Sequence, residues 1–310
     1  MLPTVSIVVP AYNAAEYLRD CLSSIRAQSL ADFEVLVVND GSSDDTPHIA
    51  VGFADSDPRF KLISIPNGGV SKARNAGITE ASGQFVTFVD ADDLLHPHAL
   101  KAMVETTLKY GSDVCVTGFR RFKDKPFFSE DRSPDVAVRQ MDYPEAMRLA
   151  LYQKIILNNP WGALIRRELF ADGRKFREGI RYEDLDAFYH FYENARSILY
   201  LPFPYYLYRN NPSSFINTWS EARLDVLDVT DRMLAFFEKG YPALIPAASD
   251  RRFSAHFNMY LLMKRHKAAN PEALERCRRV IREGRRRALS DPSVRLKNKV
   301  GALLSYLFMP

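Results

Sequence analysis

Residues 85–93, FVTFVDADD, join a run of β-branched and aromatic side chains directly to three carboxylates. Such a run favours a strand that is buried on both faces. Carboxylates that follow a parallel strand lie at the edge where open α/β sheets bind ligands. Because Asp90 and Asp92 flank a single residue, a tight turn would aim both at one cation, and hard oxygen ligands suit Mg²⁺ or Mn²⁺. The alternative is a capping cluster in which Asp93, ahead of Pro97, caps the next helix.

The composition is that of a soluble globular protein. The chain has 310 residues, of which 46% are hydrophobic and 26% charged, and these shares are ordinary for such proteins. Cys21, Cys115 and Cys277 form neither a disulfide framework nor a zinc pattern, which favours a reducing compartment. A strand-like run begins at Val5, so we expect no signal peptide. No apolar run reaches the roughly 18 residues that span a bilayer, and we expect a cytoplasmic protein.

The first half of the chain alternates between short apolar runs and amphipathic stretches. Strands that alternate with helices of this size predict a parallel sheet covered on both faces. Right-handed crossovers then bring the loops at the carboxyl ends of the strands to one rim. The predicted strands are residues 5–9, 35–38, 62–65, 85–89 and 114–119, and the predicted helices are residues 16–26, 46–53, 71–81 and 97–110.

Polar or glycine-rich loops follow four of these strands. Each loop by itself also fits a turn, a flexible joint or a helix cap. Four of them at one rim make a shared ligand site the stronger interpretation. The chain has no G-x-G-x-x-G and no G-x-x-x-x-G-K-[ST], so neither a dinucleotide site nor a P-loop is indicated. The loops are PAYN (residues 10–13), NDGSSD (39–44), NGG (67–69, leading to Lys72, Arg74 and Asn75) and DAD (90–92).

Four motifs in the first 120 residues resemble those of the family 2 glycosyltransferases of GT-A fold. They are VSIVVPAYN (residues 5–13), NDGSSDDT (39–46), ARNAG (73–77) and DADD (90–93). Their order and spacing both match, so together they are specific where each motif alone is not. Many members have two acidic residues before the Gly-Ser, whereas here Asn39 leaves Asp40 as the one carboxylate. The implied fold is α/β, a Rossmann-like and mostly parallel sheet with helices on both faces, followed here by a C-terminal helical extension.

The resemblance implies a metal-dependent, inverting hexosyltransferase that uses a nucleotide sugar, most often a UDP-sugar. The acceptor would be a saccharide or a lipid-linked saccharide in the synthesis of a surface polysaccharide. Asp92 would hold Mn²⁺ or Mg²⁺, Asp90 would contact the same metal or the ribose, and Asp40 would accept a hydrogen bond from the base. The donor-binding residues that the resemblance implies are Pro10, Tyr12, Asn13, Asp40, Lys72, Arg74, Asp90, Ala91, Asp92 and Arg209.

The pair Glu183-Asp184 precedes a predicted helix in the second half of the chain. Acids at a helix N-terminus favour the helix dipole, which is the structural alternative. An inverting transfer needs one carboxylate to take the proton of the attacking hydroxyl. The pair resembles the family's Glu-Asp motif, which makes Asp184 the base and Glu183 an orienting group or an acceptor contact. Pro160–Phe170 also resembles the family, with Trp161 as an acceptor contact and Ala163 where many members have Lys.

The chain after the acid pair changes in character. We expect two strands over residues 197–201 and 205–209, which complete a catalytic domain at residues 1–218. Residues 1–120 of this domain would bind the donor, and residues 121–218, with a connection at 123–143 and a helix at 143–152, would supply the acceptor side. A basic helical region over residues 219–310 would follow, and its part from 221 holds 18 Lys and Arg but 10 Asp and Glu.

The last helix of this region has an apolar stripe between Leu296 and Phe308, with Arg295, Lys297 and Lys299 beside it. A basic amphipathic helix predicts peripheral contact with an anionic membrane, here the inner face of the cytoplasmic membrane. The alternative is a helix that packs on the protein itself or in a homodimer.

Two other functions compete with sugar transfer. A sugar-phosphate nucleotidyltransferase has a similar sheet, but that class usually opens with a Gly-rich phosphate loop where residues 10–13 stand here. A nucleic-acid-binding protein would use the arginine-rich tail. The acidic rim would repel phosphate backbones, so we expect no nucleic-acid partner.

Overall fold

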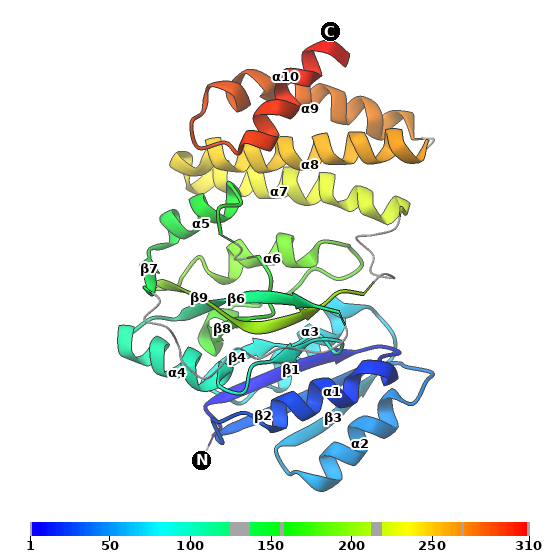
Figure 1. The fold of residues 1–310 in the computed structure, drawn as a ribbon, viewed down its shortest axis with the longest axis vertical. Coiled ribbons are helices and arrows are strands. Elements are labelled where there is room, and N and C mark those ends of the chain that lie inside the picture. The colour runs from blue at the N-terminus through cyan, green and yellow to red at the C-terminus, as the bar shows by residue number, and fades with distance from the viewer. Residues whose placement is uncertain (1, 124–136, 156–157, 212–218, 268–269, 309–310) are drawn as a thin grey trace. The chain divides into compact units, whose positions relative to one another are not determined.

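The computed structural model describes residues 2–123, 137–155, 158–211, 219–267 and 270–308 (Figure 1). The chain forms two compact units that each draw on several segments. Residues 1–143, 157–179 and 187–211 make up the first, which we call the sheet unit. Residues 144–156, 180–186 and 212–310 make up the second, which we call the helical unit. The boundary between residues 186 and 187 falls inside the helix Glu183–Phe191, so Glu183 and Asp184 belong to the helical unit.

The sheet unit is built on a nine-stranded mixed sheet with the order β3-β2-β1-β4-β8-β6-β9-β5, in which β7 also pairs with β9. The pairs of β1 with β2 and β4, of β2 with β3 and of β6 with β9 are parallel. The pairs of β8 with β4 and β6, and of β9 with β5 and β7, are antiparallel. The strands are β1 (Val5–Ala11), β2 (Phe33–Asp40), β3 (Phe60–Ile65), β4 (Phe85–Phe88), β5 (Leu94–Leu95), β6 (Val114–Phe122), β7 (Arg139–Met141), β8 (Ala163–Arg166) and β9 (Ile198–Arg209).

Helices cover both faces of the parallel part of this sheet. Leu18, Phe53 and Met103, from three different helices, share one core with Val35 and Val37 of β2. The opposite face is covered by α3, since α3 contacts both β1 and β2, and a Cβ added at Gly77 would lie 2.3 Å from a methyl carbon of Val8. The helices of the sheet unit are α1 (Ala15–Arg26), α2 (Thr46–Ser56), α3 (Val70–Glu80), α4 (Ala99–Tyr110) and, by its last five residues, α6 (Glu183–Phe191).

The expected α/β sheet is mixed, because β8 runs antiparallel between β4 and β6. Two expectations about these elements need correction. The two strands expected at 197–201 and 205–209 are one strand of 12 residues, β9, in which Pro202 and Pro204 are tolerated because its register with β6 shifts there. Asp93 does not cap the next helix, since α4 begins at Ala99 with His98 as its N-cap. The connection expected at 123–143 contains β7, and its residues 124–136 lie outside the described part.

The helical unit consists mainly of four C-terminal helices, with α7 packed on α8, and α9 on both α8 and α10. Phe237, Phe253 and Ile281 are buried in it. Asn298 of α10 donates to both carboxylate oxygens of Asp250 on α8 at 3.1 Å, which ties the last helix to the unit. No helix among the described residues combines the length and the apolar content needed to cross a bilayer. The helices are α5 (Tyr143–Leu151), α7 (Asp225–Gly240), α8 (Ile245–His266), α9 (Pro271–Ser290) and α10 (Leu296–Phe308), with short 3-10 turns at Arg167–Phe170 in the sheet unit and at Glu221–Leu224 and Pro242–Leu244 here.

Candidate active site

Asp40, the last residue of β2, joins two of the predicted loops. Its side chain is 3% exposed, and its two oxygens accept hydrogen bonds from the backbone N–H groups of Gly68 and Gly69, each at 2.8 Å. Gly69 has φ of +89°, a conformation that glycine adopts without strain. Asp40 therefore fixes the loop after β3 against the loop after β2. Oδ2 also accepts from the side chain of Asn67 at 3.5 Å. Oδ1 keeps a second lone pair, so the predicted contact with a nucleobase remains chemically open.

Asp90, Ala91 and Asp92 form a tight turn after β4, closed by a 3.0 Å hydrogen bond from the backbone N–H of Asp93 to the carbonyl of Asp90. The Asp90 carboxylate pairs with the guanidinium of Arg74 at 2.9 Å. Burial and the nearby charge of Asp90 raise the pKa of the Asp92 carboxyl. A cation at this turn would relieve the repulsion between the two carboxylates.

Besides pairing with Asp90, Arg74 packs against the ring of Phe176. Its residue is 4% exposed, and its guanidinium lies 5.4 Å from the ring centre of Phe176. Asn75 clamps that segment, because its side chain donates to the carbonyl of Phe176 and accepts from the Phe176 N–H, both at 2.9 Å. The ARNAG motif therefore positions a buried cation beside the aspartate turn. A role for Phe176 was not predicted, since nothing in the local sequence links it to residues a hundred positions earlier.

Arg209, at the end of β9, also reaches the aspartate turn. Its Nε donates to the backbone carbonyl of Asp92 at 2.7 Å. Its guanidinium lies 4.8 Å from the ring centre of Tyr17 and 4.7 Å from that of Phe122. Such stacking holds a cation at low cost in side-chain entropy. Arg209 is thus a positioned side chain and not a surface arginine.

Tyr206 makes two hydrogen bonds to the aspartate turn that the sequence did not predict. The buried hydroxyl of Tyr206 donates to Asp93 at 2.7 Å and accepts from the backbone N–H of Asp90 at 3.1 Å. Asp93 also accepts from the backbone N–H of Arg209 at 2.7 Å. Burial, with the charges of Asp90 and Asp92, raises the pKa of Asp93 well above its usual range. Tyr206 and Asp93 therefore support the turn from inside the unit.

Trp161 stacks on the ring of Tyr206. Its ring centre lies 4.5 Å from that of Tyr206 with an interplanar angle of 22°. Phe119 meets it edge-on at 5.2 Å. Trp161 is half-buried. Ala163, two residues on, is fully buried within β8.

The remaining predicted donor residues lie in the first and third loops. Pro10 is buried in β1, and Tyr12 is 56% exposed. Asn13 has φ of +46° and accepts from the backbone N–H of Ser43 at 2.9 Å, which joins the first loop to the second. Lys72 donates to the carbonyl of Pro66 at 3.2 Å.

The donor set at the turn fits a hard divalent cation. Asp90 and Asp92 offer carboxylate oxygens, and Mg²⁺ or Mn²⁺ commonly completes its coordination with waters and substrate phosphates. Among the described residues, no group of three or more His, Cys, Asp or Glu could hold a metal ion.

The predicted acids, Glu183 and Asp184, begin α6 in the helical unit. Asp184 accepts from the backbone N–H of Leu185 at 2.7 Å, as an acid at a helix start does. Tyr182, just before them, has φ of +61°, which is uncommon for a bulky residue. Strain of this kind gathers at functional sites. Both acids remain partly exposed.

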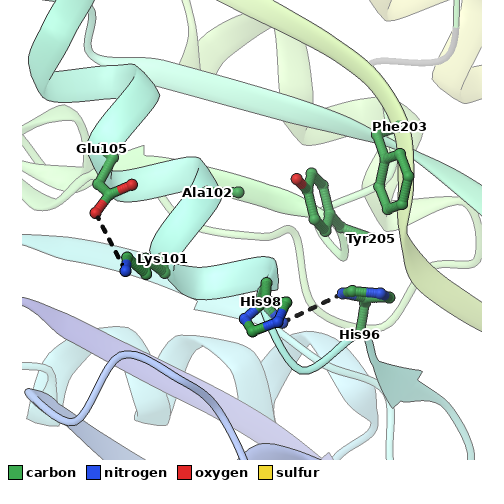
Figure 2. A pocket seen from close by; sticks show the side chains of 7 residues that line it. All are labelled: His96, His98, Lys101, Ala102, Glu105, Phe203 and Tyr205. Carbon is green, nitrogen blue, oxygen red and sulfur yellow. Dashed lines mark hydrogen bonds and ion pairs between the residues drawn. The ribbon is translucent and has the colours of Figure 1, made fainter. Parts of the chain in front are cut away.

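A cavity of about 240 Å³ lies elsewhere in the sheet unit (Figure 2). Its lining contains none of the predicted site residues. Two imidazoles come from the segment before α4, where the backbone N–H of His98 donates to Nδ1 of the His96 ring at 3.2 Å. Lys101 and Glu105 pair with each other at 3.8 Å. The cavity lacks the carboxylate turn and the buried arginines, and we assign it no part in the candidate site.

Replacing Tyr206 with Phe should lower the free energy of unfolding by about 1–3 kcal/mol, because it leaves a buried carboxyl and a backbone N–H without their shared partner. Thermal or denaturant unfolding of the two proteins measures this difference. Tyr200→Phe is the matched control on the same strand, since the hydroxyl of Tyr200 makes no hydrogen bond with any described residue. Equal losses in the two variants would show that Tyr206 does not support the turn.

Residues 6–174 match the model of glycosyl transferase family 2. The chain is 33% identical over 225 residues to the uncharacterized glycosyltransferase EpsJ of Bacillus subtilis, covering 69% of this chain and 63% of that protein. It is 29% identical over 246 residues to the glycosyltransferase GlyA of Streptococcus pneumoniae, covering 77% of this chain and 35% of that protein. The chain thus spans less than two thirds of the length of these two relatives.

Two solved structures share the fold. Residues 1–349 of S. aureus TarS, in complex with UDP-GlcNAc, superpose with a TM-score of 0.71 at 20% identity, over 98% of this chain and 89% of that one. The mannosyltransferase PcManGT from Pyrobaculum calidifontis, in complex with GDP-Man and Mn²⁺, superposes with a TM-score of 0.51 at 17% identity, over 99% of this chain and 81% of that one. The expected architecture, a GT-A-like α/β core followed by C-terminal helices, is confirmed.

Proposed function

The chain belongs to glycosyl transferase family 2, and from that premise we propose that it transfers a sugar, with inversion, from a nucleotide-sugar donor to a saccharide or lipid-linked acceptor. The observation that carries the proposal is one cluster in the sheet unit. There the Asp90–Asp92 turn, the buried Arg74 and the stacked Arg209 meet. Carboxylates beside fixed guanidinium groups suit a cation-bound diphosphate.

Each group in this cluster has a chemical task in the proposal. Arg74, Arg209 and Lys72 would offer positive charge to the diphosphate of the donor. A divalent cation on Asp90 and Asp92 would neutralise charge on the leaving diphosphate. Asp40, with the loops it holds together, would contact the base. Pro10, Tyr12, Asn13 and Ala91 would complete the donor site.

The acceptor side of the proposal uses three residues. Asp184 would take the proton of the attacking hydroxyl, because inversion in one step requires a base on the acceptor. Glu183 would orient that base or contact the acceptor. Trp161 would stack against a sugar ring. These roles rest on the chemistry and the position of the residues in the chain.

The donor is proposed to be a UDP-sugar. The TarS structure holds UDP-GlcNAc and the PcManGT structure holds GDP-Man, so the fold accommodates more than one nucleotide. A panel of nucleotide sugars, assayed for hydrolysis with Mn²⁺, with Mg²⁺ and with a chelator, tests the proposal. We expect hydrolysis of one or a few UDP-sugars that requires the cation. Release of diphosphate from a nucleoside triphosphate and a sugar phosphate would instead identify a nucleotidyltransferase.

We further propose that α10 binds an anionic membrane surface. Its apolar stripe points outward: Leu296 is 77%, Leu303 61% and Leu307 74% exposed. The opposite side of the helix packs on its own unit through Asn298 and Ala302, which are buried. Val300 and Leu304 extend the exposed stripe, and the side chain of Phe308 lies outside the described residues.

The charge of the region favours a lipid surface over a second protein copy. Residues 221–310 carry 18 basic and 10 acidic side chains, and exposed Lys297 and half-buried Lys299 flank the stripe. Each basic residue near an anionic surface adds about 1 kcal/mol, an effect that salt weakens. Two positively charged copies would repel each other at the same face.

The double variant Leu303→Glu/Leu307→Glu should weaken binding to anionic vesicles at least about tenfold, because it replaces apolar burial with charge. Co-sedimentation at low and at high salt measures this. Leu261→Glu is the matched control, since Leu261 is an exposed leucine on α8 of the same unit. If the wild type ignores anionic vesicles at low salt and runs as a dimer that the double variant abolishes, the stripe is a protein interface.

A further inference from the structure

The helical unit contains a cavity of about 330 Å³ that the proposed roles leave unexplained. One face of α8 forms one wall, since five of its residues recur there at helical spacing. The opposite wall comes from the start of α6, the 3-10 turn Glu221–Leu224 and the start of α7. The lining residues are Arg251, Ala255, Asn258, Met259 and Leu262 on α8, and Tyr182, Leu185, Arg223 and Val226 opposite.

An arginine without a pairing carboxylate among the described residues, Arg251, makes this cavity unlike a gap left by imperfect packing. Within the described part of the chain, its side chain makes no hydrogen bond or ion pair. Two other arginines of the unit are paired with carboxylates: Arg232 with Asp186 at 2.9 Å, and Arg276 with Asp228 at 2.6 Å. Arg251 instead lines open space.

The guanidinium of Arg251 nevertheless stays charged. Burial lowers the pKa of Arg251 to about 10, which leaves it protonated at neutral pH. Burying a cation without a hydrogen-bonded anion costs free energy. An anionic ligand in the cavity would recover part of that cost.

The charged groups that face Arg251 leave room for such a ligand. Asp184 and Asp250 attract it, and Arg295 repels it. Both oxygens of Asp250 already accept from Asn298. Arg223 also lines the cavity. The cavity therefore presents the guanidinium of Arg251 among largely apolar walls.

We propose that this cavity binds a phosphate group of the acceptor, with Arg251 as its contact; the inference rests on the proposed transfer and on Asp184 as its base. Guanidinium forks match the geometry of phosphate oxygens. Leu185, Val226 and Leu262 suit the organic part of a phosphate ester. The volume lies at the lower end of the range for small-molecule sites.

The position of Asp184 links this cavity to the reaction. Asp184 acts electrostatically on Arg251, and Tyr182 and Leu185, its neighbours in sequence, line the cavity. An acceptor held here by its phosphate would therefore lie beside the proposed base within one unit of the protein. Tyr182, which lines the cavity and lies two residues before Asp184, has a strained backbone.

The test is calorimetric titration of inorganic pyrophosphate, and separately of geranyl diphosphate, into the full chain in the presence of a chelator. Arg251→Gln should weaken both at least about tenfold, because it removes a charge-assisted hydrogen-bond donor. Arg251→Lys should retain part of the affinity. Arg265→Gln, which removes the same charge from an exposed position on α8, should leave the affinity within about twofold.

The outcomes separate the alternatives. Tighter binding of geranyl diphosphate than of pyrophosphate assigns the phosphate to a lipid-linked acceptor, and equal binding assigns it to a phosphorylated saccharide. Absence of binding by the wild type, unchanged affinity in Arg251→Gln, or an equal loss in Arg265→Gln overturns the inference. Thermal unfolding completes the test: we expect Arg251→Gln to unfold no earlier than the wild type. Earlier unfolding with unchanged affinity makes Arg251 a structural residue.

Failure of the proposed function is distinguishable from failure of this inference. If the wild type hydrolyses a nucleotide sugar but Arg251→Gln binds pyrophosphate normally, the inference alone fails. If pyrophosphate binds through Arg251 but no nucleotide sugar is hydrolysed or transferred, the assignment of the phosphate to an acceptor falls together with the proposed function.

Discussion

Asp184→Asn is expected to lower kcat for sugar transfer by about 10²–10⁴-fold, the range that a positioned general base contributes. The amide cannot take the proton of the attacking hydroxyl. Because the base acts on the acceptor, the affinity for the donor nucleotide should stay within about twofold. Steady-state kinetics of transfer and calorimetric titration of UDP measure the two quantities separately.

Asp186→Asn is the control on the same helix. Its carboxylate accepts from Nε of Arg232 at 2.9 Å and is buried. Its loss should therefore reduce the free energy of unfolding, by about 1–3 kcal/mol, and leave kcat of the folded enzyme nearly intact. Loss of UDP affinity in Asp184→Asn, or near-normal turnover, would mean that Asp184 is not the base, and Glu183→Gln would be tested next.

Asp92→Asn should reduce kcat/KM for transfer by about 10²–10³-fold, the scale on which losing one group that stabilises transition-state charge is felt. An amide oxygen is a poor substitute for an anionic ligand of a hard cation. The substitution also removes a carboxylate whose pKa burial and Asp90 already raise. Transfer rates at increasing Mn²⁺, together with Mn²⁺ affinity in the presence of UDP, measure the effect.

Asp55→Asn provides the control for simple loss of charge, because Asp55 is exposed on α2. It should change neither the rate nor the Mn²⁺ affinity by more than about twofold. Wild-type transfer at full rate in excess chelator would remove the metal from the proposal. It would leave Arg74 and Arg209 as the groups that offset the charge of the diphosphate.

Local patterns in the sequence determined much of the sheet unit. Alternating apolar runs and amphipathic stretches placed β1 to β4 and α1 to α4 within a few residues of their observed bounds. The ends of parallel strands meet at one edge by topology alone. The sequence therefore also predicted that Arg74 and the aspartate turn would lie together, and they pair at 2.9 Å. Four ordered motifs were enough to indicate the family, which the match over residues 6–174 confirmed.

These local patterns did not predict the direction of each strand. A short apolar strand such as β8 has the same composition whether it runs parallel or antiparallel to its neighbours. Its antiparallel pairing with β4 and β6 is seen only in the structure. The same holds for β9, whose prolines indicate a break although the shifted register with β6 accommodates them.

Only the tertiary structure decided which side chains support the site. The hydroxyl of Tyr206 meets Asp90 and Asp93 across more than a hundred residues of chain, and a contact of that range leaves no periodic or local trace. The exposure of the α10 stripe depends on which side of the helix packs on its neighbours, and the pattern alone allowed either. Arg251 looks like any other arginine in a basic helix. Only the fold shows that Arg251 lines a cavity, whereas Arg232 and Arg276 form ion pairs with carboxylates.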